Sequence, residues 1–172
     1  HKSLKIKEEI GDKDGIAYSF NNMGTIYLLQ NDYKKGLDYF NKAYKLQLEV
    51  NNKNGAAQTL NNIGYLYFNE GKFKQALEYY EKSLVQRKIL RDKQGIAETI
   101  INMGGLYQKL ANQNELKKDK KAQDSLNNKA LNCFKEALAI QQVSEDKKGA
   151  SVSLINMAEI LFAQGEIKLA EE

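Results

Sequence analysis

The chain has 172 residues, of which 42% are hydrophobic and 28% charged, a balance typical of a folded protein with a full core. Its formal net charge is only +4 and both signs are interspersed, so the sequence does not predict the one-signed surface of a nucleic-acid-binding protein. No apolar run approaches the length of a membrane-spanning helix.

One eight-residue pattern recurs along the chain and sets its organisation. It occupies residues 20–27, 60–67, 100–107 and 154–161. The spacings are 40, 40 and 54 residues, the last being one period plus an insertion of 14 residues. A fixed period in this range predicts an array of helical repeats, in which each unit buries its apolar face against its neighbours.

The first residues belong to the same array, because residues 2–15 match residues 82–95. We therefore expect a partial helix from about Lys2 to Glu9, the end of a preceding repeat, and interpret the chain as a piece of a longer protein. The predicted boundaries are 1–11 for this partial helix, 12–51 and 52–91 for two repeats, 92–145 for a third repeat with its insertion, and 146–172 for a truncated fourth repeat.

The sequence of each repeat predicts a capped first helix, a short turn and an antiparallel second helix. The linkers that open the repeats begin with Asp12, Asn52, Asp92 and Asp146, whose short side chains suit an N-cap. The first helices are expected to end at Asn31, Gly71 and Gly165, because these residues tolerate a left-handed backbone.

Three glycines, Gly24, Gly64 and Gly104, lie inside the expected first helices. A glycine inside a helix costs roughly 1 kcal/mol relative to alanine. We therefore expect close helix packing at each of these glycines.

The insertion lies between the two helices of the third repeat, at residues 111–128. Residues 115–121 have high helix propensity and carry four lysines without an apolar face. Two interpretations have equal weight, a protruding hairpin that adds about two turns to each helix and a mobile loop. The lysines could contact an acidic partner, but a solvated charged segment is the simpler interpretation.

These repeats resemble the tetratricopeptide repeat (TPR), whose first helix carries an aromatic residue, Leu-Gly and Tyr and whose second helix carries Ala, Phe and Pro. The matching residues are Phe20, Met23, Gly24, Tyr27, Gly36, Phe40 and Ala43; Leu60, Ile63, Gly64, Tyr67, Ala76 and Tyr80; and Ile100, Met103, Gly104, Tyr107, Ala130, Phe134 and Ala137. The fourth copy is weaker, with Ala158 and Leu161 at the glycine and tyrosine positions. The resemblance implies an all-α fold, an α–α superhelix of antiparallel helix pairs stacked with a right-handed sense. The long period and the missing proline make the pattern most similar to the repeats of kinesin light chains and bacterial signalling proteins.

The sequence shows no metal-ligand cluster, phosphate-binding glycine loop or catalytic dyad, so we expect no enzymatic activity, no cofactor and no metal. His1, the only histidine, stands at the start of the sequence, far from the only cysteine, Cys133. Cys133 aligns with Tyr39 in the second-helix pattern, and we expect it to be a packed side chain.

An asparagine stands at the same position of every first helix, although asparagine is a poor helix former. Four copies indicate a hydrogen-bonding role, and residues at i−4, i+3 and i+7 share a stripe with each. In TPR proteins this face lines the concave groove, so the resemblance implies that the asparagines hold the backbone of a bound peptide. The alternative is that these amides link neighbouring helices of the array. The predicted groove residues are Asn22, Asn62, Asn102, Asn156, Tyr18, Thr25, Gln58, Tyr65, Asn69, Glu98, Lys109 and Glu159.

The sequence therefore favours a protein- or peptide-binding scaffold, the sensory or adaptor segment of a larger bacterial signalling or regulatory protein. The alternative is an architectural module for homo-oligomerisation without a groove ligand. We expect Leu154, Met157, Leu161 and Phe162 to be exposed and to drive end-to-end association through cut repeat ends. No nucleic acid partner and no membrane insertion are expected for this segment. One cysteine leaves the compartment open, and we favour the cytoplasm over the periplasmic side of a membrane-bound sensor.

Overall fold

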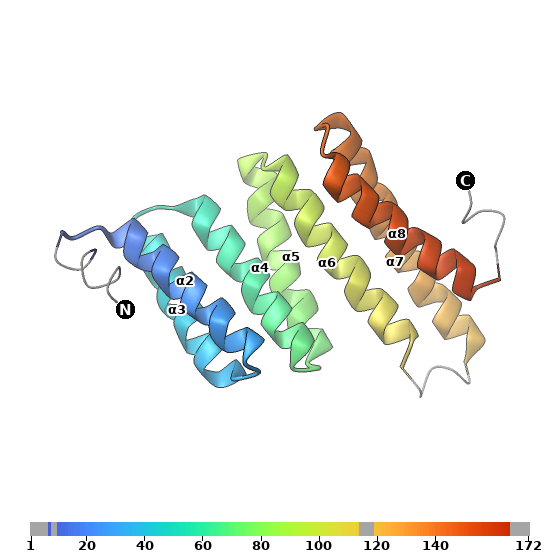
Figure 1. Ribbon diagram of the computed structural model, residues 1–172, viewed down its shortest axis with the longest axis horizontal. Coiled ribbons are helices and arrows are strands. Elements are labelled where there is room, and N and C mark those ends of the chain that lie inside the picture. Colours follow the sequence, from blue (N-terminus) through green and yellow to red (C-terminus); the bar gives the residue numbers. More distant parts are fainter. Residues whose placement is uncertain (1–6, 8–9, 114–118, 166–172) are drawn as a thin grey trace. The chain divides into compact units, whose positions relative to one another are not determined.

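The computed structural model describes residues 7, 10–113 and 119–165, and all regular structure in these ranges is α-helical, which confirms the all-α class. The expected partial helix from Lys2 to Glu9 lies outside the described residues except for Lys7. No helix of the described ranges has the length and apolar character needed to cross a membrane. The helices, labelled in Figure 1, are α2 (Lys13–Leu29), α3 (Tyr33–Glu49), α4 (Lys53–Asn69), α5 (Phe73–Leu90), α6 (Lys93–Ala111), α7 (Lys120–Val143) and α8 (Lys147–Ala163).

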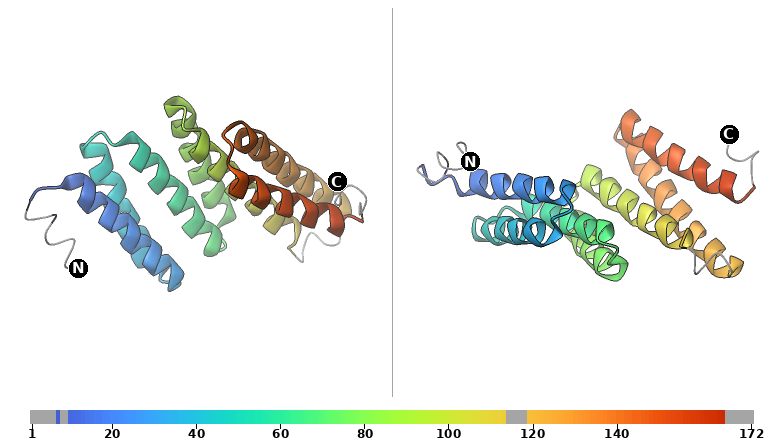
Figure 2. Two further views of the ribbon diagram at one scale, coloured as in Figure 1. Left: turned by 45° about the horizontal axis from the view of Figure 1, so that its top comes forward. Right: turned by 60° about the horizontal axis from the view of Figure 1, so that its bottom comes forward.

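The helices form two compact units, residues 1–91 with α2 to α5 and residues 92–172 with α6 to α8. In unit 1, α2 packs against α3, α4 against α5, and α3 against α4. In unit 2, α7 packs against both α6 and α8. Figure 2 shows these antiparallel neighbours from two further directions. The arrangement within each unit is the TPR-like stacking of consecutive helix pairs.

The linker motif starts each first helix with one side-chain hydrogen bond. Asp12 accepts from the N–H of Gly15 at 2.8 Å, which makes Asp12 the N-cap of α2. A Cβ atom on Gly15 would lie only 2.0 Å from Oδ2 of Asp12, so the capping residue and the glycine fit together. The same bond recurs in the pairs Asn52–Gly55, Asp92–Gly95 and Asp146–Gly149, which confirms the predicted caps.

The turns after the helices use left-handed backbone. Asn31, Gly71 and Gly165 have φ values of 59°, 80° and 82°, as expected for the ends of the first helices. The second helices end the same way at three non-glycine residues that the sequence did not indicate. These are Asn51, Arg91 and Glu145, with φ values of 56°, 56° and 57°.

The glycines inside the first helices allow each helix pair to approach closely, as predicted. A Cβ atom on Gly64 would lie 2.6 Å from Cδ1 of Tyr80 on α5. The corresponding distances are 2.6 Å from Gly24 to Phe40 Cδ1 and 2.7 Å from Gly104 to Phe134 Cε1. The ring of the second helix therefore lies directly on the backbone of the first.

Successive pairs are joined by an apolar cluster and a buried polar contact. In unit 1 the cluster contains Leu28, Phe40, Ile63 and Leu66. Beside it, Thr59 Oγ1 on α4 donates to Gln47 Oε1 on α3 at 2.8 Å, and both side chains are buried. In unit 2, Ser153 Oγ on α8 donates to Gln141 Oε1 on α7, also at 2.8 Å. We call these two contacts the hydroxyl–glutamine pairs.

The insertion lengthens mainly the second helix of the third repeat. Helix α7 has 24 residues where α3 has 17, whereas α6 has 19 residues where α2 has 17. The expected equal division of the insertion between the two helices is therefore wrong, since α6 gains only two residues. Residues 114–118 of the insertion lie outside the described residues.

The exposed apolar residues of α8 differ in part from those expected. Leu154 and Phe162 are 52% and 67% exposed. Met157 and Leu161 are half-buried, which corrects the expectation for them, because they pack against an apolar cluster shared by α7 and α8. That cluster consists of Ala130, Leu131, Phe134 and Ile160.

Candidate ligand-binding faces and a polar pocket

The predicted groove residues of unit 1 form two stripes on the adjacent helices α2 and α4. Tyr18, Asn22 and Thr25 are exposed on α2. On α4, Tyr65 and Asn69 are exposed, whereas Gln58 and Asn62 are half-buried. Helical spacing adds Leu29 to the α2 stripe, and none of these residues carries a charge. One charge lies beside them, because the ammonium of Lys7 is over the ring of Tyr18, 5.6 Å from its centroid. We call this surface the neutral face.

Asn62 takes part in a hydrogen-bond network across three helices of unit 1. Its Nδ2 donates to Asn21 Oδ1 on α2 at 3.1 Å, and its Oδ1 accepts from Gln58 Nε2 at 3.2 Å. Gln58 in turn accepts from the Arg87 guanidinium on α5 at 2.5 Å. The amide of Asn62 thus links neighbouring helices, and it retains one N–H and one lone pair for a ligand.

Asn22 differs from Asn62, because its exposed side chain makes no hydrogen bond to any residue that the structure describes. The sequence analysis missed the residue beside it, Asn21, which supplies the contact with Asn62. A signal for Asn21 was present, since Asn61 stands one period later.

The predicted groove residues of unit 2 lie on α6 and α8 and include charges. Glu98, Lys109 and Glu159 are exposed, whereas Asn102 and Asn156 are half-buried. The position of Asn21 is taken here by Ile101, so Asn156 has no counterpart of the amide–amide bond of unit 1. The two units therefore present faces of different chemistry.

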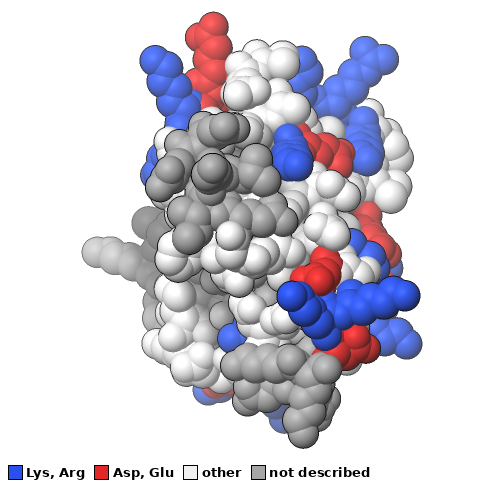
Figure 3. All heavy atoms as spheres, turned by 90° about the vertical axis from the view of Figure 1, so that its right-hand side faces the viewer, with Lys and Arg blue, Asp and Glu red and all other residues white. Residues whose placement is uncertain are grey.

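Ion pairs and rings cover the second helices of unit 1. Asp38 and Lys42 form an i,i+4 pair at 2.7 Å on α3. Asp32 caps α3, and its hydrogen bond with Lys35 holds the pKa of this carboxyl below its ordinary value. Lys35 also lies over the ring of Tyr27, 5.2 Å from the centroid. Figure 3 draws a different face, the one at the right-hand side of Figure 1, and there charges of both signs are scattered among uncharged side chains.

Reactive groups are few in the described part of the chain. No set of three His, Cys, Asp or Glu side chains that could hold a metal ion occurs among the described residues. Cys133 is half-buried, as expected, and burial raises the pKa of its thiol to about 11. Burial likewise raises the pKa of Tyr80. Both shifts follow from packing and disfavour the charged forms.

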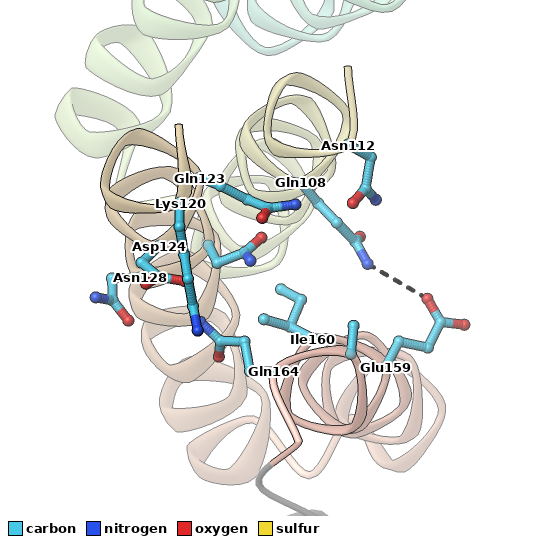
Figure 4. Close-up of a pocket in the computed structure, with 11 residues that line it drawn as sticks. Gln108, Asn112, Lys120, Gln123, Asp124, Asn128, Glu159, Ile160 and Gln164 are labelled. Atoms are coloured by element: carbon cyan, nitrogen blue, oxygen red, sulfur yellow. Dashed lines mark hydrogen bonds between the residues drawn. The ribbon is translucent and has the colours of Figure 1, made fainter. Parts of the chain in front are cut away.

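Unit 2 also contains a polar pocket of about 580 Å³ that the sequence analysis did not foresee. Figure 4 shows its side chains converging from α6, α7 and α8. Across it, Gln108 Nε2 on α6 donates to Glu159 Oε2 on α8 at 3.4 Å. Glu159 is the one predicted groove residue among its lining residues, which are Gln108, Asn112, Lys120, Gln123, Asp124, Asn127, Asn128, Glu159, Ile160, Ala163 and Gln164.

Comparison with known families identifies the first two repeats. Two models described as tetratricopeptide repeat match residues 17–49 and 57–87. No curated protein sequence matches the chain.

Several solved structures share the fold. BtubC (BKLC) from P. vanneervenii matches with a TM-score of 0.70 and 21% identity, over 92% of this chain and 60% of that protein. Aspartyl phosphate phosphatase F from Bacillus subtilis matches with a TM-score of 0.75 and 17% identity, over 92% of this chain and 38% of that protein. A Podosopora anserina protein described as a kinesin light chain, with nearly identical TPR-like repeats, matches with a TM-score of 0.63 and 11% identity. That match covers 98% of this chain and 77% of that protein.

Proposed function

Because the chain is a tetratricopeptide-repeat protein, we propose that its neutral face binds an extended segment of a partner protein. Proteins of this family are typically scaffolds for protein–protein interaction and not enzymes. The chain spans 60% and 38% of the first two similar structures. We further propose that it is the sensory or adaptor segment of a larger, bacterial signalling protein.

The observation that carries this proposal is the exposure of uncharged and apolar side chains along α2 and α4. Tyr18 and Leu29 are 63% and 76% exposed, and Tyr65 is exposed on α4. The second helix α3, by contrast, covers its surface with charges such as the Asp38–Lys42 pair. A solvated helix face is normally charged, so a neutral face with exposed rings is typical of a surface that a partner covers.

The amides between these rings suit the backbone of an extended peptide. Such a peptide rises about 3.3 Å per residue and presents one N–H and one C=O at each step. Asn22 can use its whole amide, and Asn62 its remaining N–H and lone pair. Each hydrogen bond should contribute about 0.5–1.5 kcal/mol, equivalent to a few-fold to about tenfold in affinity.

The test is a calorimetric titration with a peptide selected from a display library against this chain. Asn22→Ala and Tyr18→Ala should each weaken binding by a few-fold to about tenfold and leave the melting temperature unchanged. Asn62→Ala should weaken binding and also lower the melting temperature, because it removes the bond between α4 and α2. Asp38→Asn on α3 serves as the matched control. If Asn22→Ala and Tyr18→Ala both bind like the parent chain, the neutral face is not the site.

A second candidate function, self-association, is favoured by the exposed apolar residues of α8. Leu154, Ile155 and Phe162 are all more than half exposed. Burying them against another copy would remove apolar surface from water. Sedimentation equilibrium should then show concentration-dependent association that Phe162→Lys abolishes. A chain that stays monomeric at high concentration would exclude this candidate.

A further inference from the structure

Unit 2 has a polar pocket at the place where unit 1 has part of its apolar core. In unit 1, Leu28 is buried in the cluster between α2, α3 and α4, and Tyr33 packs against that cluster. The repeat pattern places Gln108 at the position of Leu28 and Asn127 at the position of Tyr33. Two amides thus replace a leucine and a tyrosine, and the space that the ring fills in unit 1 becomes open.

Asn127, which replaces the tyrosine, is a polar side chain in largely buried surroundings. Its side chain is only 7% exposed and lines the pocket. Within the part of the chain that the structure describes, it makes no side-chain hydrogen bond. The amide is not among the side-chain groups that are closed off from solvent without a partner, so its polar atoms open into the pocket. An aromatic ring at this position would instead bury apolar surface and stabilise the fold. A polar ligand in the pocket can therefore bond to both the N–H and the C=O of this amide.

The inserted turns of α7 complete the pocket. Lys120, Gln123 and Asp124 lie on the residues of α7 that have no counterpart in α3 or α5. Gln123 Nε2 donates to the carbonyl of Ala111 at 3.3 Å and so ties the inserted turns to the end of α6. In Figure 4, Gln123 on α7 reaches toward the hollow across from Ile160 on α8, and Asp124 lies next to it on the same helix.

We propose that this pocket binds a peptide residue with a basic side chain. The lining amides each offer donors and acceptors, which match the N–H and C=O of a peptide group. The carboxylates of Asp124 and Glu159 outnumber the single ammonium of Lys120 among the lining residues, so the pocket favours a cation. Asp124 is half-buried, and a charge-assisted bond to a guanidinium is strong in such surroundings. The proposal is independent of the neutral face of unit 1.

The probe is N-acetyl-arginine methylamide, which carries two peptide groups and one guanidinium. It is titrated into the ¹⁵N-labelled 172-residue chain and followed by NMR, with the citrulline analogue as a neutral probe of the same shape. We expect saturable shifts of the Asn127 side-chain amide and of the Gln123 and Asp124 backbone amides. The citrulline analogue should bind at least about fivefold more weakly, because it lacks the charge that Asp124 and Glu159 attract.

Two variants separate binding from folding. Asn127→Tyr restores the residue type of unit 1, and it should raise the melting temperature while reducing binding at least about tenfold. Asp124→Asn keeps the shape of the pocket and should weaken binding about fivefold or more without changing the melting temperature. Asp38→Asn in unit 1 is the control and should bind like the parent chain.

Three results would overturn the proposal. Equal affinity for the citrulline analogue would show that no cation is recognised, and shifts confined to other residues would place the ligand elsewhere. Tighter binding of free arginine than of the capped probe would identify a free amino acid, and not a peptide residue, as the ligand. Loss of peptide binding at the neutral face changes none of these readouts, so the two proposals fail separately.

Discussion

The hydroxyl–glutamine pair between Thr59 and Gln47 should contribute measurably to the stability of unit 1. Thr59→Val keeps the shape of the side chain but removes the hydroxyl that donates to Gln47 Oε1 at 2.8 Å. Gln47 and Thr59 are 4% and 0% exposed, so water cannot easily replace the lost donor. A buried acceptor without its partner costs about 1–3 kcal/mol, and each kcal/mol lowers the Tm of a chain of this size by about 2–4 °C.

The assay is urea unfolding followed by circular dichroism, arranged as a double-mutant cycle. Replacing both groups by apolar ones removes the acceptor together with its donor, so Gln47→Met combined with Thr59→Val should be less destabilising than the sum of the single changes. The coupling energy should be about 1 kcal/mol or more. The equivalent pair in unit 2, Gln141 and Ser153, provides a replicate. A Thr59→Val chain whose free energy of unfolding stays within about 0.5 kcal/mol of the parent would refute this reasoning.

Three further predictions are tested by urea unfolding. Gly64→Ala should destabilise the fold by about 1–3 kcal/mol, because the added Cβ would overlap the facing ring of Tyr80. Gly105→Ala should stabilise the fold by about 0.5–1 kcal/mol, because no atom lies within 4 Å of its added Cβ. Equal effects of the two substitutions would contradict the packing argument. Asp146→Ala should cost about 1 kcal/mol through loss of the N-cap of α8, and Asp146→Asn should restore most of it. Burial raises the pKa of the Cys133 thiol to about 11 from an ordinary value of 9.0, so the unfolded chain ionises first. The free energy of unfolding should then fall between these two pH values by more than in Cys133→Ala, and parallel pH profiles would exclude the effect.

Local physics made much of the fold predictable from the sequence. A cap such as Asp12 with Gly15 involves residues three apart, and Gly24 at a fixed helical position signals close packing on its own. Both features depend only on residues that lie close together in the sequence, so the sequence alone is enough to predict them. The insertion was predictable in position but not in form, because helix propensity does not determine which helix is extended.

Contacts between helices were much less predictable. Asn62 was recognised as a hydrogen-bonding residue, but its partner Asn21 lies one position away from the predicted stripe of α2. The choice among adjacent residues depends on the rotation and offset of α4 against α2, which side-chain packing sets. The sequence could therefore propose both a ligand and a neighbouring helix as the partner of Asn62.

The sequence by itself determined the helix pairs, the caps that start the first helices, and the recurrence of an asparagine in every first helix. Tertiary structure alone decided which side chains meet, including Gln108, Asn127 and Glu159 around one pocket. The physical reason is that capping and periodicity act within a few residues, whereas a pocket depends on how three separate helices pack. In the sequence Asn127 is an ordinary polar residue, and only the tertiary structure buries it beside the pocket formed by α6, α7 and α8.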